Sequence, residues 1–390
     1  MITPPATLGL LGGGQLGRYF VLAARQAGYA VIVLDPDPAS PGGALADRHL
    51  VADFDDDAAL DELADACAVV TAEFENIPAA SLERVASRGC LRPGVRALTI
   101  AQDRLAEKHF LGEAGVAVAP WCAIPAGQPP AEPASGPHPD LGPGFPAVLK
   151  TARLGYDGKG QVRLAAAEDL AAAHADLGRV DCVLEERVDL AREVSVLVAR
   201  SPDGHSEVFP VAENLHRAGV LHRTRVPARL SPVLDAQARE VALRIAEQLD
   251  YCGVLAVEFF VTTGGELLVN EIAPRPHNSG HYTLDACSVS QFEQQLRAVC
   301  GLALAPARVT APVAMVNLLG ELWPSAGAPD WTGLLGERRA RVHLYGKAAA
   351  RPGRKMGHVN VVGLPGEADA DAVSEIAETL WQNLAGEPSQ

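Results

Sequence analysis

The sequence predicts a chain of mixed α/β and α+β class, with a mostly parallel sheet first, an α+β block next and a small β-rich domain last. Strand-like apolar runs alternate with helical stretches up to about Gly94, and hairpin-linked apolar strands follow from Ala147. The tail from about Pro312 has strands and a helix of its own. At roughly 150 residues per domain, the length suggests two or three domains. The changes of pattern along the chain place them at 1–100, 101–305 and 306–390.

The N-terminal domain is expected to have βαβ order. Its first strand leads through a glycine turn into a helix, and the alternation repeats, which favours a parallel sheet. The expected elements are Leu8–Leu11, Leu16–Ala27, Ala30–Leu34, Leu60–Cys67, Ala68–Ala72 and Ser81–Ser87. A further helix is expected at about Ala101–Ala114, where Gly115 ends it.

A proline-rich segment separates this domain from the strands that follow. Residues 120–146 contain nine prolines and four glycines, which predicts an exposed loop or linker without regular structure. Helices are expected beyond it at Leu234–Leu249 and at about Asp371–Leu384. The expected strands are Ala147–Thr151, Gln161–Leu164, Cys182–Glu186, Val194–Ala199, Glu207–Pro210, Val254–Val261, Glu266–Ile272, Ala314–Leu318, Ala340–Leu344 and His358–Val362.

Composition limits the partners and the compartment. Lys and Arg total 33 against 48 Asp and Glu, and a net charge of -15 repels nucleic acid and anionic membrane surfaces. No basic residue precedes Arg18, and no apolar run approaches the ~18 residues that span a bilayer, so we expect a cytoplasmic protein. The seven cysteines are scattered without a C-x-x-C pair, which argues against a disulfide framework and a zinc site.

Gly12–Gly17 has the order G-x-G-x-x-G between the first strand and its helix, and Asp35 ends the next strand, where a ribose-binding acid could lie. One hypothesis is therefore an NAD-dependent oxidoreductase. A second is a loop that binds another anion at the helix N-terminus. A third is a tight turn that needs glycine for its backbone alone.

A second glycine-rich loop, Gly155–Gln161, begins five residues after Lys150. Its three glycines allow backbone N–H groups to close over phosphates, and Lys150 and Lys159 add positive charge. Because Lys150 ends an apolar strand, we favour a phosphate lid over a flexible hairpin with solvated lysines.

Two glutamates are predicted to meet across a hairpin. If Gly264 and Gly265 form a two-residue turn, residues whose numbers sum to 529 face each other, and Glu258 lies opposite Glu271. Two carboxylates in apolar strands repel, so the pair requires a shared proton or a cation between them. Mg²⁺ bound jointly with nucleotide phosphates suits such oxygen ligands. The alternative is a pair of exposed glutamates at strand ends.

Two further segments are rich in groups that bind anions. Pro274–His281 combines Arg, His and Asn side chains with two prolines that stiffen it, and Lys347 with Arg351–Lys355 forms a basic patch. On so acidic a chain, concentrated positive loops indicate sites for a small anionic ligand. A solvated basic loop is the alternative for the second patch.

These motifs, in this order, resemble those of the ATP-grasp superfamily and closely resemble the N5-carboxyaminoimidazole ribonucleotide synthetase family. The resemblance implies an ATP-grasp fold with a Rossmann-like N-terminal domain, a lid subdomain at about 120–190 and a homodimer. It runs from residue 8 to residue 360 through the segments Gly12–Arg18, Thr71–Glu75, Asp103–Arg104, Ala147–Lys150, Gly155–Gln161, Arg192–Ser195, Glu213–His216, Asn270–His281 and Arg351–His358.

The family implies ATP, Mg²⁺, bicarbonate and 5-aminoimidazole ribonucleotide as reactants in purine biosynthesis, with ADP, phosphate and the N5-carbamate as products. By resemblance, Glu258 and Glu271 hold Mg²⁺ between the β- and γ-phosphates. The residues implied to hold ATP are Arg104, Lys150, Gly155, Tyr156, Asp157, Gly158, Lys159, Gly160, Gln161, Glu185, Glu186, Arg187, Val188, Glu193, His216, Asn270 and Glu271.

The same resemblance assigns the remaining chemistry. Arg275 and His277 would hold bicarbonate, and Asp157 would orient or deprotonate the amine that attacks the carbon of carboxyphosphate. Lys347 is a fourth catalytic candidate. The residues implied to hold the ribonucleotide are Gln15, Leu16, Glu73, Asn278, Lys347, Arg354 and Lys355.

Three positions depart from the family pattern. Many ATP-grasp enzymes have a metal-binding Asn two residues after the second glutamate, where this chain has Ala273, which leaves open whether Asn270 or another group replaces it. The 120–146 segment is proline-rich where relatives carry a helix, and Leu154 stands where a glycine is expected. The rival classes are the oxidoreductase, which leaves the glutamate pair and the second loop unexplained, and a non-catalytic nucleotide-binding protein.

Overall fold

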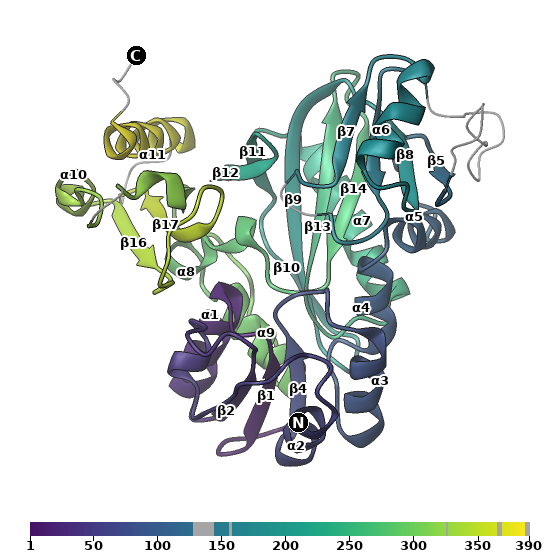
Figure 1. Cartoon of the computed structure of the whole chain (residues 1–390). Helices are drawn as coiled ribbons and strands as arrows, with labels where there is room; N and C mark the ends of the chain where they lie inside the picture. Colours follow the sequence, from purple (N-terminus) through teal and green to yellow (C-terminus); the bar gives the residue numbers. More distant parts are fainter. Residues whose placement is uncertain (128–143, 156–157, 325–326, 365–368, 387–390) are drawn as a thin grey trace.

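The computed structural model describes residues 1–127, 144–155, 158–324, 327–364 and 369–386. These residues form a parallel sheet at the bottom of Figure 1, a long central sheet that continues into the C-terminal strands on the left, and a small lid sheet at the upper right. The arrangement confirms the expected fold class, and the lid, the central sheet and the N-terminal domain surround most of the site residues that the sequence predicts.

The N-terminal domain has the predicted parallel sheet, in the order β3-β2-β1-β4. Strand β3 was not predicted because its three residues include an Arg and a His. Apolar side chains on both faces of the sheet form two cores. The elements are β1 (Thr7–Leu11), α1 (Gln15–Gln26), β2 (Ala30–Leu34), β3 (Arg48–Leu50), α2 (Asp57–Ala66), β4 (Val69–Ala72) and α3 (Ala79–Arg88).

Two short helices, α4 (Val95–Ala101) and α5 (Arg104–Glu113), replace the single helix predicted at 101–114. The break comes from Asp103, whose carboxylate accepts hydrogen bonds from Leu105 N and Ala106 N and so caps α5. Arg104 is therefore the first residue of α5, next to the lid.

The lid is an antiparallel sheet with a core of its own, in the order β5-β8-β6-β7. Its first strand contradicts the prediction of an exposed linker over the whole of 120–146, because Trp121, Cys122 and Ile124 are buried and pair with β8. Residues 128–143 of that segment lie outside the described part. The elements are β5 (Trp121–Ile124), β6 (Ala147–Thr151), β7 (Gln161–Leu164), α6 (Leu170–Asp176) and β8 (Cys182–Glu186).

The central sheet runs β14-β13-β9-β11-β12-β15-β17-β16, with β10 paired to β9. It crosses from the predicted second domain into the third through the β12–β15 pairing. Strands β11 and β12 were not predicted, because Arg and His alternate with their apolar residues. The strands are β9 (Leu190–Arg200), β10 (Ser206–Val208), β11 (Ala212–Arg217), β12 (Val220–Val226), β13 (Gly253–Thr262), β14 (Leu267–Ala273), β15 (Val313–Leu319), β16 (Ala340–Leu344) and β17 (Lys355–Val362).

Helices cover the central sheet on both faces. Helix α7 packs against β9 and β13, α9 joins this sheet to the N-terminal domain, and α11 covers the C-terminal strands (Figure 1). The amphipathic helix α9 was not predicted. The bounds are α7 (Pro232–Gln248), α8 (Thr283–Ala286), α9 (Gln291–Cys300), α10 (Thr332–Gly336) and α11 (Ala370–Ala385), with short 3-10 turns η1 (Gly43–Leu45), η2 (Ala167–Asp169), η3 (Asn278–Gly280) and η4 (Gly320–Leu322).

The β13–β14 hairpin brings Glu258 opposite Glu271, as predicted, but by a different register. Near the turn, Phe259 pairs with Val269, which is one residue away from the expected pairing. Asn270 is an extra residue in β14, and this bulge restores the pairing of the two glutamates.

The bulge also decides which way Glu271 points. A strand without it would place Val269 and Glu271 on the same face. Val269 and Ile272 instead both belong to the core beneath the sheet, while Glu271 lines the opposite face. One inserted residue thus moves a carboxylate out of an apolar core and onto the face where the predicted site residues lie.

In the part of the chain that the structure describes, no helix has the length and apolar character needed to cross a membrane. All seven cysteines lie in this part and carry free thiols, which agrees with the predicted lack of a disulfide framework.

Candidate active site

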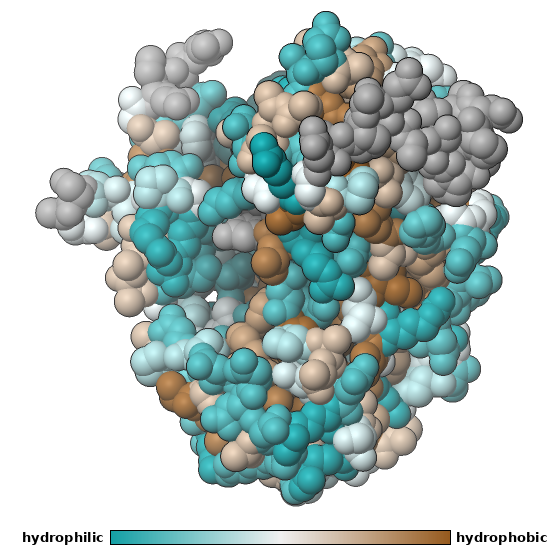
Figure 2. Space-filling view, turned by 45° about the vertical axis from the view of Figure 1, so that its right-hand side comes forward, coloured by the Kyte–Doolittle hydropathy of each residue, from teal (hydrophilic) through white to brown (hydrophobic). Residues whose placement is uncertain are grey.

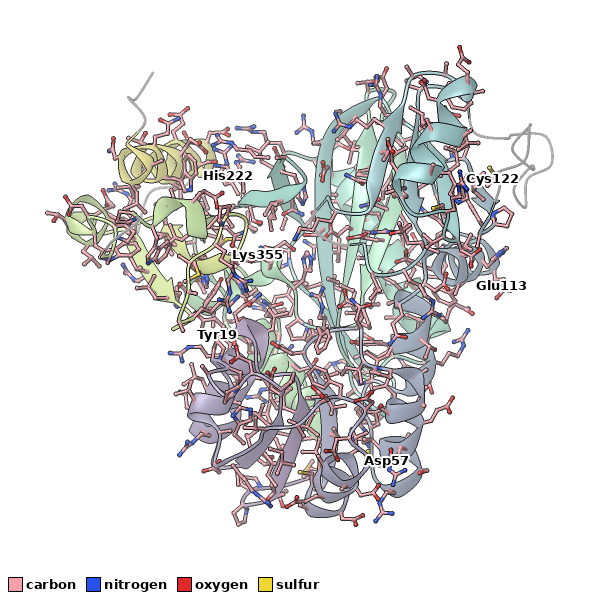
Figure 3. The ribbon with its side chains drawn as sticks, viewed as in Figure 1. Tyr19, Asp57, Glu113, Cys122, His222 and Lys355 are labelled. Atoms are coloured by element: carbon pink, nitrogen blue, oxygen red, sulfur yellow. The ribbon has the colours of Figure 1, made fainter. Side chains whose placement is uncertain are left out.

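A cavity of about 1070 Å³ lies where the lid, the central sheet, α1 and the C-terminal strands meet. Lys355, labelled in Figure 3, reaches this region from the C-terminal strands. The cavity brings together the following predicted site residues: Gln15, Leu16, Glu73, Arg104, Lys150, Gly155, Gly158, Lys159, Gln161, Glu185, Glu186, Arg187, Val188, Glu193, His216, Glu258, Asn270, Glu271, Arg275, His277, Asn278 and Lys355.

Five predicted residues stand apart from this set. Tyr156 and Asp157 lie outside the described residues. Gly160, Lys347 and Arg354 do not line the cavity. Lys347 Nζ nevertheless donates to Oε1 of a lining residue, Gln15, at 2.7 Å, whereas Arg354 Nη1 donates to a backbone carbonyl of its own loop at 2.8 Å.

Glu258 and Glu271 each have a hydrogen-bonding partner within the chain, so their pairing does not by itself require a cation between them, contrary to the sequence argument. His277 Nε2 lies 3.0 Å from Glu258 Oε1, and Arg104 Nη1 donates to Glu271 Oε2 at 2.9 Å. Burial alone would raise the pKa of Glu258, but His277, His216 and Arg275 together lower it to about 2. Glu258 is therefore charged at neutral pH.

Oxygen atoms beside this pair suit a hard cation. Asn270, the bulge residue, lines the cavity, and its buried Oδ1 has no hydrogen-bond partner among the described residues. Ala273, where many relatives have the metal-binding Asn, packs in an apolar core and has no polar side-chain atom that could bind a metal. Within the described ranges, no group of three or more His, Cys, Asp or Glu side chains forms a closed metal site. An open carboxylate pair is what Mg²⁺ uses when phosphates complete its shell.

The sequence reasoning missed Lys108, which is almost fully buried beside the cavity. Its Nζ lies 3.2 Å from Glu185 Oε1, and Lys150 Nζ donates to Glu185 Oε2 at 2.7 Å. Burial would raise the pKa of Glu185, but the two lysines lower it to about 2. The four-residue spacing from Arg104 on α5 was the signal that could have identified Lys108.

Glu107 was missed as well. It is buried, lines the cavity and accepts a hydrogen bond from Ile272 N at 2.6 Å through Oε1. Burial and the charge of Glu271 raise the pKa of Glu107 to about 7. In the sequence, Glu107 looks like any other polar residue of a helix, so no local pattern indicates that it is buried at the site.

The described part of the glycine lid covers one end of the cavity. Gly158 and Gly160 have φ values of 76° and 70°, which side chains rarely adopt. Gly158 packs so closely on Gly219, in the turn between β11 and β12, that an added Cβ would lie 3.1 Å from its Cα. On the same strand pair, His216 Nδ1 lies 2.5 Å from Glu193 Oε2, and this ion pair raises the pKa of His216 although burial opposes it.

The first glycine loop already holds carboxylates of the chain itself. Glu73 accepts hydrogen bonds from Gly14 N and Gly17 N, and Asp35 accepts one from Gly13 N at 2.6 Å. These are the N–H groups and the acid that a dinucleotide would use. Burial raises the pKa of Glu73. Because these N–H groups are already bonded to carboxylates of the chain, the structure disfavours the hypothesis of an NAD-dependent oxidoreductase.

The Pro274–His281 segment places its cation beside the N-terminal domain. Arg275 forms two hydrogen bonds with Glu75, from Nε at 2.5 Å and from Nη2 at 3.2 Å. Arg275 lowers the pKa of Glu75, although burial would raise it. This ion pair joins the loop after β4 of the N-terminal domain to the segment after β14, close to the glutamate pair. Glu75 lies in the quoted Thr71–Glu75 motif, but its partner could not be read from the sequence.

Models of three domain families match consecutive parts of the chain. The ribonucleotide synthetase preATP-grasp domain matches residues 5–102, the ATP-grasp domain residues 109–292, and the phosphoribosylaminoimidazole carboxylase C-terminal domain residues 313–370.

Full-length relatives agree with these matches. N5-carboxyaminoimidazole ribonucleotide synthase of Brucella melitensis biotype 1 is 44% identical over 92% of this chain and 96% of its own length, and that of Bacillus subtilis is 41% identical over 99% and 98%. A crystal structure of an ADP complex of such a synthetase has a TM-score of 0.88 at 41% identity and covers 98% of this chain and 99% of its own. The Aspergillus clavatus enzyme with ADP and 5-aminoimidazole ribonucleotide has a TM-score of 0.83 at 30% identity, with 98% of each chain covered. The chain therefore belongs to the N5-carboxyaminoimidazole ribonucleotide synthase family of ATP-grasp ligases.

Proposed function

We propose that this chain carboxylates the amine of 5-aminoimidazole ribonucleotide with bicarbonate, at the cost of one ATP, and thereby acts in purine biosynthesis. The observation that carries the proposal is a cavity lined at once by Lys150, by the Glu258/Glu271 pair and by residues from the N- and C-terminal domains. Groups that suit a nucleoside triphosphate and groups that suit a second anionic substrate thus share one space.

ATP would lie between the lid and β13–β14. Lys150, Lys159 and the lid N–H groups would hold its phosphates, the backbone from Glu185 to Val188 would face the adenine, and Glu193 would accept from the ribose. Glu258 and Glu271 would hold Mg²⁺, which the orphaned oxygen of Asn270 also suits. When bound, the metal neutralises charge on the β- and γ-phosphates.

Bicarbonate would bind beside this pair, at Arg275 and His277. Its oxygen attacks the γ-phosphorus, the bond to ADP breaks, and carboxyphosphate forms. The substrate amine then attacks the carboxyl carbon, the bond from carbon to phosphate oxygen breaks, and phosphate leaves. The amine loses a proton, which we assign to Asp157, a residue outside the described part of the chain. Because the intermediate hydrolyses in water, lid closure over Gly158 would serve to exclude water.

The ribonucleotide would enter from the side of α1 and the C-terminal strands. Lys347, Arg354 and Lys355 would supply positive charge for its phosphate, while Gln15, Leu16, Glu73 and Asn278 would contact the rest of the molecule. The hydrogen bond from Lys347 to Gln15 supports a shared site between the first and last domains.

ADP release measured with each substrate omitted in turn tests this function. We expect release to require ATP, Mg²⁺, bicarbonate and 5-aminoimidazole ribonucleotide together, with one carbamate formed per ADP. Glycinamide ribonucleotide is the control acceptor and should not stimulate release. Turnover with that acceptor, or NADH oxidation with a carbonyl substrate in place of ADP release, would contradict the proposal.

We also propose a cytoplasmic homodimer, which the resemblance to the family supports. Light scattering coupled to size-exclusion chromatography tests the assembly. A mass of about twice 40.8 kDa is expected, and a mass of 40.8 kDa at all concentrations would contradict it.

A further inference from the structure

A buried chain of side-chain hydrogen bonds runs from the central sheet to His277. Its members come from β12, β11, β9 and the turn η3, and all are buried. We call it the hydroxyl relay, and from its far end it consists of Thr224, Asn214, Ser195 and Ser279. It ends at His277, whose Nδ1 lies 2.8 Å from Ser279 Oγ.

The hydrogen bonds of the relay run in one direction. Thr224 Oγ1 donates to Asn214 Oδ1 at 3.0 Å, and Asn214 Nδ2 donates to Ser195 Oγ at 2.9 Å. Because Ser195 accepts that bond, its own hydrogen is available to Ser279 Oγ, 2.8 Å away. Ser279 then has one hydrogen left, which it donates to His277 Nδ1.

The backbone of η3 fixes the same direction independently. Ser279 N also points at His277 Nδ1, at 3.3 Å, and a backbone N–H can only donate. Nδ1 of His277 is thus an acceptor, so the hydrogen of the neutral ring lies on Nε2. That hydrogen faces Glu258 Oε1, 3.0 Å from Nε2, which is a suitable acceptor.

We propose that the hydroxyl relay positions His277, by holding its ring in one plane and by keeping Nε2, the nitrogen on the Glu258 side, a hydrogen-bond donor. With Glu258 turned to Mg²⁺, as proposed above, this N–H would be free to donate to an oxygen of bicarbonate, whereas a bare ring nitrogen would repel it. This inference rests on the proposed function, in which His277 is a bicarbonate ligand. The relay residues themselves do not line the cavity, so they act only through His277.

The relay has a physical rationale as a coupled unit. Each buried hydroxyl or amide has its partner in the next member, and removal of one member leaves its neighbour with an unsatisfied polar group. The sheet supplies three of the four members, so the ring is fixed to the most rigid part of the molecule rather than to its own loop. Placement on strands gives the precision that a reacting group requires.

Matched variants test the relay. Thr224→Val removes the first hydroxyl without changing shape, and Thr224→Ser keeps it. Ser279→Ala removes the last hydroxyl. We expect Ser279→Ala to lower kcat about tenfold and to raise the KM for bicarbonate, with the KM for ATP changed less than about twofold. Thr224→Val should show a smaller effect of the same kind, and Thr224→Ser should restore wild-type values.

The ring itself can be observed by ¹⁵N NMR of histidine-labelled protein, in which His277 is identified by the signal lost in His277→Gln. The wild type is expected to show Nδ1 without hydrogen and Nε2 with it. Asn214→Asp replaces the donor by an acceptor, draws the Ser195 hydrogen away from Ser279 and should populate the opposite tautomer. A wild-type ring with hydrogen on Nδ1 would overturn the inference.

The outcomes separate this inference from the proposed function. If His277→Gln leaves kcat and the bicarbonate KM unchanged, the assigned role of His277 fails, while the ring spectra still test the relay. If His277→Gln abolishes turnover but Ser279→Ala, Thr224→Val and Asn214→Asp change neither spectra nor bicarbonate KM, the relay alone fails. Ser374→Ala, a buried serine in the C-terminal domain, is the control and should behave as wild type.

Discussion

Glu271 interacts with groups of both signs, and these interactions decide what its replacement does. It forms an ion pair with Arg104, and its charge raises the pKa of the buried Glu107. The repulsion that the sequence suggested for Glu258 and Glu271 is thus offset at Glu258 by His277, and it acts on Glu107 instead. The sequence analysis named Arg104 and His277 as site residues, but it could not show which carboxylate each of them contacts.

Glu271→Gln is expected to abolish turnover, because it removes one of two charges proposed to hold Mg²⁺. The variant loses the ion pair with Arg104, but it also removes the repulsion between Glu271 and Glu107. Its free energy of unfolding without ligands should therefore stay within about 1 kcal/mol of wild type. ADP release and urea unfolding measure the two effects. Glu266→Gln, at the exposed end of the same hairpin, is the control. A loss above ~3 kcal/mol would mean that Glu271 is a structural residue.

Glu107→Gln is expected to make stability less dependent on pH. The folded-state pKa of Glu107, about 7, lies above its ordinary value of 4.5. The protonated carboxyl therefore favours the folded state fully below pH 4.5, and this contribution is lost as pH rises through 7. Gln cannot ionise and still accepts from Ile272 N. The variant should match wild type at pH 4.5 and exceed it by on the order of 2 kcal/mol at pH 8, as measured by urea unfolding. An equal difference at both pH values would contradict this reading.

The residues that sequence reasoning found are those whose role follows from a local string. Lys150, the lid glycines and Glu258 were identified because strand ends, glycine spacing and hairpin register are local. Glu107, Lys108 and the hydroxyl relay were missed because each acts through partners on other elements. Thr224, for example, has no neighbour in sequence that marks it, and its proposed role depends on a strand that was not itself predicted.

At the scale of elements, one bulge determines the chemistry of β14. Asn270 changes the register by one residue, so that Glu271 leaves the core face and Ile272 takes its place there. The predicted two-residue turn gave the right glutamate pairing only because the shifted turn and the bulge offset each other. Periodicity alone cannot reveal such a compensation, because the apolar residues on either side of the bulge look like one continuous strand.

Deletion of Asn270 is expected to abolish activity and to destabilise the protein, because it would turn Glu271 toward the core and Ile272 toward the cavity. Burying an unpaired carboxylate costs several kcal/mol. Asn270→Ala keeps the bulge and removes only the orphaned oxygen, so it should fold normally and raise the KM for Mg·ATP several-fold. Urea unfolding and ADP-release kinetics on both variants distinguish the effects. A deletion variant with normal stability would show that the bulge does not determine which side chains of β14 point toward the core.

Leu154 occupies a backbone conformation with φ of 61°, as the expected glycine would, and its side chain is 73% exposed. Leu154→Gly relieves a cost of about 1 kcal/mol, and a similar gain in unfolded-chain entropy opposes it. Overall stability should therefore change by less than ~0.5 kcal/mol, whereas the lid should open more often. Hydrogen exchange at lid amides is expected to speed up, and the KM for ATP to rise about two- to threefold. Leu335→Ala, another exposed leucine, should do neither.

At the scale of the whole molecule, the continuous central sheet joins parts that the sequence divides. Strand β15 pairs with β12, and Glu378 of α11 forms ion pairs with Arg217 of β11 and Arg223 of β12. His222, labelled in Figure 3, also contacts Glu378 at this junction. The face in Figure 2 is largely hydrophilic, with hydrophobic residues scattered over it. The sequence could not reveal this continuity between the second and third predicted domains, since β11 and β12 carry polar residues.

The shared sheet predicts that the ATP-binding region and the C-terminal strands unfold together. Three of the four tryptophans, Trp323, Trp331 and Trp381, lie in the C-terminal part, and Trp121 lies in the lid. In Trp121→Phe, fluorescence therefore follows the C-terminal part alone, while Mg·ADP is proposed to bind between the lid and β13–β14. At a free concentration of one hundred times its dissociation constant, Mg·ADP adds about 2.7 kcal/mol to the free energy of unfolding of the region that unfolds together with its binding site.

We therefore expect Mg·ADP to raise the fluorescence-detected Tm of Trp121→Phe by at least ~2 °C, in parallel with the Tm from circular dichroism. The physical reason is that unfolding the β15–β17 region removes the hydrogen-bonded edge of β12, and with it the strand pair that carries His216 and contacts the lid. Glu378→Gln should weaken the contact of α11 with β11 and β12. The two regions should then unfold less cooperatively, and the two Tm values should differ. If Mg·ADP raised the Tm from circular dichroism but left the fluorescence-detected Tm unchanged, the two regions would unfold independently although they share one sheet.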